Sequence, residues 1–379
     1  MFDLTDEQLA IQRLTRDFAE GEIKPIAEEI DRDHRFPYEV VAKAGELGLM
    51  GIPYDEEYGG GGADNLSYTL AIEELTRVDS SVAITVAAHT SLGTYPIYAF
   101  GTDEQKAQYL PDLCSGRRLW SFGLTEPEAG SDAGNVHTTA KLEDGEWRIN
   151  GAKQFITNAG TDISGGVTIT ARTGENEISN IIVPRDTPGY TVEPAYRKMG
   201  WNASDTRPLA FESCRVPEGN LIGHRGKGLA QFLATLAGGR ISVAAMGLGL
   251  AQGALDQALA YAKERKAFGK PISKFQAIQG KLADMATEIE AARLLTYKAA
   301  FLKDQTDPPR TFTLTAAQAK LKTGRLAVRC AEEAVQIHGG YGYIEEYPVC
   351  RFYRDAKILT IGEGTDEIQQ MVIARALGA

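Results

Sequence analysis

The stretch "KLEDGEWRINGAKQFITNAG" (residues 141–160) is β-like, although most of the 379-residue chain around it has helical patterns. It contains the pairs Asp144-Gly145 and Asn150-Gly151, which are typical of tight hairpin turns, and short strand-like runs flank each pair. Three further runs, "GGVTITAR", "SNIIVPR" and "PLAFESCRVP", cluster or alternate β-branched residues and end in turn signals. We therefore predict a middle antiparallel β domain over residues 118–228.

Both flanks of this β-like region have helical patterns. Before it, "LTDEQLAIQRLTRDFAEGEI" repeats apolar residues at three- and four-residue steps after an N-cap candidate, Thr5. After it, three long amphipathic segments and the shorter "TDEIQQMVIARAL" have lengths that suit an antiparallel four-helix arrangement. The predicted fold is α+β and multidomain, with an N-terminal α-helical domain (1–117), the β domain (118–228) and a C-terminal four-helix-bundle domain (229–379).

The composition narrows the classes of function. A formal net charge of -11 disfavours broad nucleic-acid binding, which needs a basic face. The start "MFDLTDEQLA" lacks the segments of a signal peptide, and no uninterrupted apolar run reaches the roughly 18 residues of a membrane span. The four cysteines lie far apart without a CxxC pair, which disfavours a metal site or a disulfide framework. We expect a cytoplasmic protein that binds neither nucleic acid, membrane nor metal.

Two segments of the predicted β domain have residues that suit a ligand-binding edge. "FGLTEPEAGSDAG" (residues 122–134) combines hydroxyls with glycines that let backbone N–H groups approach a polar planar ligand. It lacks the spacing of a phosphate-binding glycine-rich loop. "FITNAG" puts Phe155 and Thr157 on one face of a strand. Taken singly, the first segment also fits a plain turn-rich connection, and the second also fits core packing.

Three segments of the C-terminal half carry further candidates. "ERKAFGKPI" places Arg265, whose guanidinium suits phosphate, at the end of a long helix, where a solvated basic helix end is the alternative. "QIHGGYGYIEEYPVCRFYRDAKI" has glycines that can lie flat on a ligand edge. "IGEGTDEIQ" (residues 361–369) presents Glu363 between two glycines, so that another group can come very close to the acid.

Together, in this order and with these separations, the segments resemble the acyl-CoA dehydrogenase family over the whole chain. "FGLTEPEAGSDAG" looks like the family's first signature, and "QIHGGYGYIEEYPVCRFYRDAKILTIGEGTDEIQ" looks like its second, base-bearing signature. The predicted order of α, β and α domains agrees with that family's architecture. The resemblance implies an FAD enzyme that oxidises a fatty acyl-CoA thioester between its α and β carbons and passes the electrons to an electron-transfer flavoprotein.

The resemblance also implies which residues hold FAD without a covalent link. Those lining the flavin would be Phe122, Leu124, Thr125 and Ser131, with Phe155 and Thr157 on its other side. Those reaching the pyrophosphate and adenosine half across a dimer contact would be Arg265, Phe268, Phe275 and Gln276, with Gln336, Gly339 and Gly340 in a segment that a neighbouring subunit contributes. Thr365 and Glu367 match further FAD contacts. A cofactor shared in this way implies an obligate oligomer, a homotetramer built as a dimer of dimers.

Glu363 matches the family's catalytic base. By resemblance it would abstract the α proton while a hydride passes from the β carbon to flavin N5. Burial beside flavin and acyl chain would raise its pKa, and its own backbone N–H would stabilise the developing enolate. Ser131, Arg240 and Gly364 match residues near the CoA-bearing substrate. Some relatives carry the base immediately before the arginine, but Gly239 stands there, so Glu363 is the only candidate at a family base position.

Five positions depart from the family pattern. Ala237 stands where many members carry Asp, Phe155 where Trp often covers the flavin, and Ala267 where a hydroxyl or glutamine is frequent. Gly362 precedes the base where Tyr is common, which predicts a wider pocket that tolerates branched or longer acyl groups. Ala83 replaces the arginine of glutaryl-CoA members, which disfavours a dicarboxyl substrate. Two alternatives stay open, an acyl-CoA oxidase that uses oxygen and a flavin-free acyl-CoA-binding protein.

Overall fold

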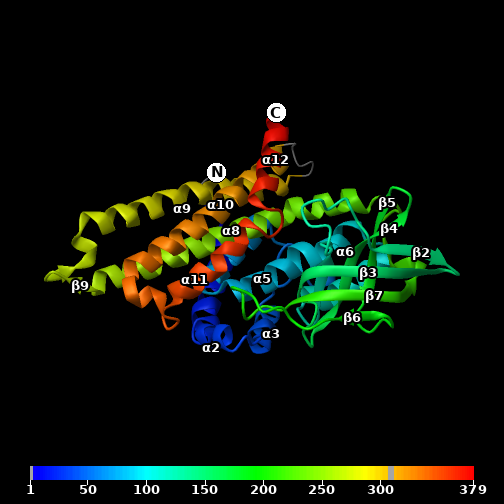
Figure 1. Cartoon of the computed structure of the whole chain (residues 1–379), viewed down its shortest axis with the longest axis horizontal. Coiled ribbons are helices and arrows are strands. Elements are labelled where there is room, and N and C mark those ends of the chain that lie inside the picture. Colours follow the sequence, from blue (N-terminus) through cyan, green and yellow to red (C-terminus); the bar gives the residue numbers. More distant parts are fainter. Residues whose placement is uncertain (1–2, 306–310) are drawn as a thin grey trace.

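The computed structural model describes residues 3–305 and 311–379, and its first part is helical (Figure 1). The helices are α1 (Asp6–Phe18), α2 (Ala27–Arg32), α3 (Tyr38–Glu46), α4 (Asn65–Val78), α5 (Ser80–Ala88), α6 (Tyr95–Phe100) and α7 (Asp103–Cys114), with π-helical turns at Ala19–Ile23 and His89–Thr94 and a 3₁₀ turn at Glu56–Tyr58. The predicted cap is confirmed, because the Thr5 hydroxyl accepts from the Gln8 N–H and the Gln8 side chain accepts from the Thr5 N–H.

The middle part of the chain is one eight-stranded sheet. Its strands are β1 (Leu119–Gly123), β2 (Thr139–Glu143), β3 (Glu146–Thr157), β4 (Ser164–Gly174), β5 (Glu177–Pro184), β6 (Tyr190–Val192), β7 (Thr206–Pro217) and β8 (Leu221–Ile222). The order is β6-β7-β3-β2-β4-β5-β8, with β1 paired to β4. The prediction of an antiparallel domain needs a correction, because β1 and β4 are parallel and the sheet is therefore mixed. The β2–β3 hairpin lies in the long connection that such a parallel pair requires.

The two predicted turns of the β domain have different outcomes. The turn at Asp144-Gly145 is confirmed, since it joins β2 to β3 with Glu143 opposite Glu146. The turn predicted at Asn150-Gly151 is wrong, because both residues lie inside β3 at a register shift. Gly151 has φ +149°, and a Cβ there would lie 2.5 Å from Thr138 Oγ1. The glycine serves close packing at a bulge rather than a chain reversal.

Helix returns after the sheet and continues to the C-terminus. The elements are α8 (Gly228–Glu264), the short paired strands β9 (Lys266–Ala267) and β10 (Lys270–Pro271), a 3₁₀ turn at Ile272–Lys274, α9 (Gln276–Lys303), α10 (Thr311–His338), η6 (Gly339–Tyr343), α11 (Pro348–Ala356), η7 (Lys357–Thr360) and α12 (Asp366–Leu377). α8, α9 and α10 run side by side, and the sheet lies at the opposite end of α8 from β9 (Figure 1). The predicted α, β, α order is confirmed.

α8 is the central helix and packs against both α4 and α10. Its glycines permit the close approach: a Cβ at Gly249 would lie 2.2 Å from the Glu73 carbonyl oxygen in α4, and one at Gly247 would lie 2.8 Å from the Thr323 carbonyl oxygen in α10. α8 is also long and apolar enough to cross a membrane. However, 83% of its most apolar window is buried inside the structure, as is usual for a core helix. One apolar core therefore joins the first and last helical parts.

A fully buried ion pair anchors the loop after β1 to the sheet. Lys153 Nζ in β3 lies 2.7 Å from Glu126 Oε1 and donates to the Leu124 carbonyl at 3.1 Å, and both charged side chains are at most 2% exposed. The Glu126 carboxylate also accepts from the N–H groups of His137 and Thr138. Burial lowers the pKa of Lys153 to about 8, and Glu126 opposes this shift. The pair thus holds both ends of the loop against β3.

We expect Lys153→Met to destabilise the protein by about 3–5 kcal/mol, because the substitution leaves the Glu126 carboxylate buried without its cation. Denaturant unfolding monitored by circular dichroism would measure the loss. Lys24→Met is the matched control, since Lys24 pairs with Glu20 at the surface and its removal should change stability far less. Equal stabilities of the two variants would contradict the anchoring role.

Candidate active site

The acid that stands between two glycines lies in a tight turn between η7 and α12. Glu363 has φ +52° and Gly364 has φ +93°, so two successive residues are left-handed, which is strained for a glutamate. Two fully buried side chains hold the turn. Lys320 Nζ donates to the Gly364 carbonyl at 2.7 Å, and Gln369 Nε2 donates to the Glu363 and Gly364 carbonyls at 3.2 and 2.9 Å.

The Glu363 carboxylate packs against α8. A Cβ built on Gly239 would lie 2.1 Å from Glu363 Oε2 and 3.0 Å from Leu92 Cδ2, so a side chain at position 239 would displace the carboxylate. Glu363 is partly exposed as a residue, but Oε2 is enclosed and has no hydrogen-bond partner among the described residues. A buried carboxylate oxygen without a donor is costly in a structure that serves only folding. Oε2 is therefore free to take a proton.

Two cations moderate the effect of burial on this acid. Burial raises the pKa of Glu363 to about 7, while Lys320 and Arg240 oppose the rise. Arg240 follows Gly239 on α8, is 5% exposed, and its Nε has no partner in the described part of the chain. Burial also lowers the pKa of Lys320 to about 8. The structure thus brings together Glu363, Gly364 and Arg240, three of the residues that the sequence singles out.

The candidates of the β domain lie together where β1 meets β3. Phe122 in β1 stacks on Phe232 of α8, with ring centroids 5.8 Å apart. Ser121 Oγ donates to the Thr157 carbonyl at 2.9 Å, and the Gln154 N–H donates to the Thr125 carbonyl at 2.8 Å. The segments "FGLTEPEAGSDAG" and "FITNAG", which are far apart in the sequence, therefore form one continuous surface.

Phe155 gives this surface an exposed aromatic ring. The residue is 64% exposed, has φ +60°, and its ring centroid lies 5.2 Å from that of Tyr196. The N–H groups of Thr125 and Ser131, in the loop that follows β1, have no hydrogen-bond partner within residues 3–305 and 311–379. An exposed ring and free N–H donors can bind a planar polar ligand.

A second group of candidates lies at the far end of α8, away from the sheet (Figure 1). Arg265 follows α8, and its guanidinium lies 5.5 Å from the Tyr341 ring centroid. Phe268, between β9 and β10, is 95% exposed. The remaining members are Phe275, Gln276, Gln336, Gly339 and Gly340. At 1.5 Å per residue, α8 separates Arg240 from Arg265 by about 37 Å. The structure therefore does not bring this group to Glu363 within one chain.

Thr365 and Glu367 directly follow the turn that carries Glu363. The Thr365 hydroxyl accepts from the Ile368 N–H at 3.3 Å and caps α12, so this side chain already has a structural role. Glu367 lies in the first turn of α12 and is exposed.

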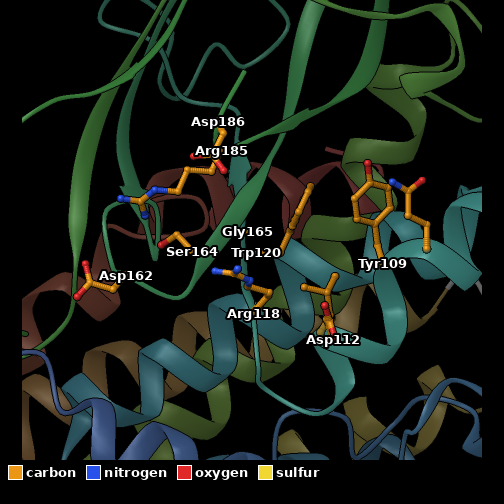
Figure 2. Close-up of a pocket in the computed structure, with 11 residues that line it drawn as sticks. Tyr109, Asp112, Arg118, Trp120, Asp162, Ser164, Gly165, Arg185 and Asp186 are labelled. Carbon is orange, nitrogen blue, oxygen red and sulfur yellow. The ribbon is translucent and has the colours of Figure 1, made fainter. Parts of the chain in front are cut away.

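A surface pocket of about 470 Å³ lies elsewhere, between α7 and strands β1 and β4 (Figure 2). Its wall includes Tyr109, Arg118, Trp120 and Arg185. None of the site residues singled out by the sequence lines this pocket. The pocket is therefore separate from the region around Glu363.

Three models of the same protein family match the chain in sequence order. The N-terminal domain of acyl-CoA dehydrogenase matches residues 5–117, its middle domain residues 121–214 and its C-terminal domain residues 226–378. The chain belongs to the acyl-CoA dehydrogenase family. It is 54% identical over 379 residues to a probable acyl-CoA dehydrogenase of Bacillus subtilis, with 99% of each chain covered. Butyryl-CoA dehydrogenase from Megasphaera elsdenii has a TM-score of 0.96 and 45% identity, with 100% of both chains covered.

The predicted cofactor is confirmed, because the acyl-CoA dehydrogenase family is FAD-dependent. An acyl-CoA dehydrogenase complexed with FAD from Bacillus anthracis has a TM-score of 0.92 and 34% identity, covering 99% of this chain and 67% of that one. The residues of this chain fit such a group. The exposed Phe155 ring offers a stacking face, and the free N–H groups of Thr125 and Ser131 are donors for a polar ring edge.

Sequence analysis does not identify three polar residues whose hydrogen bonds hold parts of the site in place. Lys153 anchors the loop after β1, and Lys320 and Gln369 hold the turn that carries Glu363. The signal for Lys320 is a lysine on the buried face of the amphipathic α10, since lysine is rarely buried without a specific partner. Each of the three donates to a backbone carbonyl outside its own helix or strand, and Lys153 also pairs with the Glu126 carboxylate, contacts that no sequence pattern identifies.

We expect Gly239→Ala to reduce turnover at least tenfold while the protein still folds, because the new methyl group occupies the space of Glu363 Oε2. Gly362→Ala is the matched control on the other side of the same site. A Cβ at Gly362 meets only the Ile358 carbonyl oxygen at 3.5 Å and Ile358 Cγ1 at 4.0 Å, both ordinary contacts. Steady-state rates of both variants test this, and equal rates would show that Gly239 does not position the carboxylate.

Proposed function

We propose that the protein oxidises an acyl-CoA thioester to the trans-2-enoyl-CoA, with Glu363 abstracting the α proton. The observation that carries the proposal is the enclosed Oε2 of Glu363, which has no hydrogen-bond partner among the described residues. Burial raises the pKa of the Glu363 carboxyl group to about 7. A carboxylate of that pKa is ionised in part at neutral pH and is a stronger base than an ordinary glutamate. The Glu363 N–H also makes no hydrogen bond to another described residue.

The groups of this chain account for the proton transfer. The α C–H bond breaks, its proton goes to the Glu363 carboxylate, and its electron pair forms the new double bond as the β C–H bond breaks. The free Glu363 N–H is a donor for the thioester oxygen, where negative charge develops. Arg240 and Lys320 keep the base partly ionised before the transfer. FAD, held by Phe122, Thr125 and Phe155 among others, would supply the acceptor for the hydride that leaves the β carbon.

We infer that FAD is shared between two copies of the chain. One copy would hold the flavin with Phe122, Leu124, Thr125 and Ser131 on one side and Phe155 and Thr157 on the other. The other copy would supply Arg265, Phe268, Phe275, Gln276, Gln336, Gly339 and Gly340, and Thr365 and Glu367 would add further contacts. Phe122 stacks on Phe232 of α8, and about 50 Å of this helix lies between Phe232 and Arg265. This separation supports the division, because one chain cannot place both groups on one cofactor. A homotetramer, built as a dimer of dimers, satisfies it.

The substrate and the electron acceptor are proposed from the site and the relatives. Ser131, Arg240 and Gly364 would hold the CoA-bearing substrate, and the butyryl-CoA dehydrogenase neighbour supports butyryl-CoA as one of the substrates. A solved structure from a study of the electron transferring flavoprotein of Acidaminococcus fermentans is 45% identical, with a TM-score of 0.97, and supports an electron-transfer flavoprotein as acceptor. Rapid reoxidation by oxygen would instead indicate an oxidase, and absence of bound flavin would indicate a binding protein.

We expect Glu363→Gln to abolish turnover, by about a thousandfold or more, while the yellow flavin stays bound. The amide keeps the size of the side chain but cannot take the proton. Dye-coupled assays with butyryl-CoA and the flavin absorbance of the purified variant measure the two properties. Glu175→Gln is the control, since Glu175 is an exposed residue between β4 and β5. Retained turnover in Glu363→Gln would refute the assigned base.

We expect the wild-type protein to accept branched and longer acyl groups, because position 362 carries no side chain beside the base. Gly362→Tyr should lower kcat/KM for isobutyryl-CoA and hexanoyl-CoA about tenfold relative to butyryl-CoA, since a Cβ at this position makes only ordinary contacts with Ile358 and the ring would narrow the acyl pocket. A panel of acyl-CoA thioesters compares the two proteins. A wild-type enzyme that strongly prefers the straight four-carbon thioester would show that the missing ring does not widen the pocket.

A further inference from the structure

We infer that Lys320 and Gln369 are positioning residues of the catalytic turn, Gln369 through hydrogen bonds alone and Lys320 through both a hydrogen bond and its charge. This inference deepens the proposed function and rests on Glu363 being the base. Lys320 lies outside the segments that resemble the family's signatures, and Gln369 is the last residue of the base-bearing one. Neither is needed to explain how the substrate or FAD is bound.

The geometry places three hydrogen bonds on two successive carbonyl groups. Lys320 comes from α10 and Gln369 from α12, and both are 0% exposed. Lys320 Nζ donates to the Gly364 carbonyl, and Gln369 Nε2 donates to that carbonyl and to the Glu363 carbonyl. Because both carbonyls are bound on this side, the backbone of Glu363 stays in its left-handed conformation, which is strained for a non-glycine residue.

This arrangement determines what the turn presents to a substrate. With the carbonyls of Glu363 and Gly364 occupied, the Glu363 N–H remains without a partner in the described chain, and the carboxylate lies against Gly239. The carboxylate that accepts the proton and the N–H group that would bind the oxyanion thus belong to one residue, Glu363. Lys320 and Gln369 fix the backbone of this residue through its own carbonyl and that of Gly364. Loss of either buried donor would let the turn relax and would misplace both groups together.

The charges around the turn come from three helices and must be considered as a set. Glu363 faces Lys320 of α10, Arg240 of α8 and the hydroxyl of Tyr68 of α4. Lys320 in turn faces Glu363, Asp366 and Glu367 as well as Arg240. Lys320 is therefore a cation that both bonds the turn and acts on the base, whereas Gln369 bonds the turn without charge. Variants of the two residues therefore distinguish the effect of positioning the turn from the effect of a nearby positive charge.

The test measures kcat and kcat/KM against pH for the holoenzyme and its variants with butyryl-CoA. The wild-type rate should rise with pH through about 7, because Glu363 must lose its proton before it can act. Gln369→Met should lower kcat about tenfold and leave the midpoint of this rise unchanged. Lys320→Met should lower kcat similarly and move the midpoint upward by about one pH unit, because a cation near the carboxylate is lost. Lys320→Arg should restore the wild-type midpoint.

Two further variants keep the test decisive. If Lys320→Met does not fold, Lys320→Gln retains a donor but not the charge and should still move the midpoint upward. Lys198→Met is the matched control, because the half-buried Lys198 also donates to a backbone carbonyl, that of Ser204, and its loss should affect stability without moving the midpoint.

The outcomes distinguish this inference from the proposed function. If Glu363→Gln is inactive but folded Lys320 and Gln369 variants keep the wild-type kcat and midpoint, the positioning role is wrong and the base stands. If Lys320→Met shifts the midpoint no further than Lys198→Met, the charge of Lys320 does not act on the base. If Glu363→Gln itself retains turnover, the proposed function fails before this inference is reached.

Discussion

The close packing of α8 between α4 and α10 is the constraint on which the rest of the structure depends. At Gly249 and Gly247 the neighbouring carbonyls leave no space for a side chain, so α8 is held between the other helices at short range. Three parts of the proposed site then lie along this one helix. Phe232 stacks against Phe122 of β1, Gly239 contacts the Glu363 carboxylate, and Arg265 follows the C-terminal end of α8.

The turn that carries Glu363 has three features that would each cost free energy without a compensating neighbour. The Glu363 backbone is in the left-handed conformation, Oε2 of its carboxylate is enclosed, and two backbone carbonyls are removed from water. Each feature is offset by a specific neighbour: buried donors satisfy the carbonyls, and Lys320 and Arg240 face the acid. The result is an acid whose pKa lies near neutrality without an acceptor or donor fixed on Oε2. The carboxylate of Glu126, by contrast, accepts hydrogen bonds on both oxygens.

Local patterns predicted most of the fold. The capping box at Thr5, the hairpin at Asp144-Gly145 and the α, β, α order follow from residues close together in the chain, where turn chemistry and periodicity act. Predictions that needed distant contacts were wrong, as for the Asn150-Gly151 pair, which packs on Thr138, and for the parallel pairing of β1 with β4. The boundaries after residues 117 and 228 stay predictions.

By itself the sequence determined the family and the cofactor, because both follow from contiguous segments with strict residue types, and from the same segments it predicts Glu363 as the base. Only the tertiary structure decided what surrounds that acid. Gly239 meets its carboxylate, and Lys320 and Gln369 hold its backbone from two other helices. Likewise, about 50 Å of α8 lies between Phe232, on which Phe122 stacks, and Arg265, so the two groups of cofactor candidates lie far apart within one chain. The physical reason is that burial, charge balance and reach depend on contacts between residues that the chain keeps far apart.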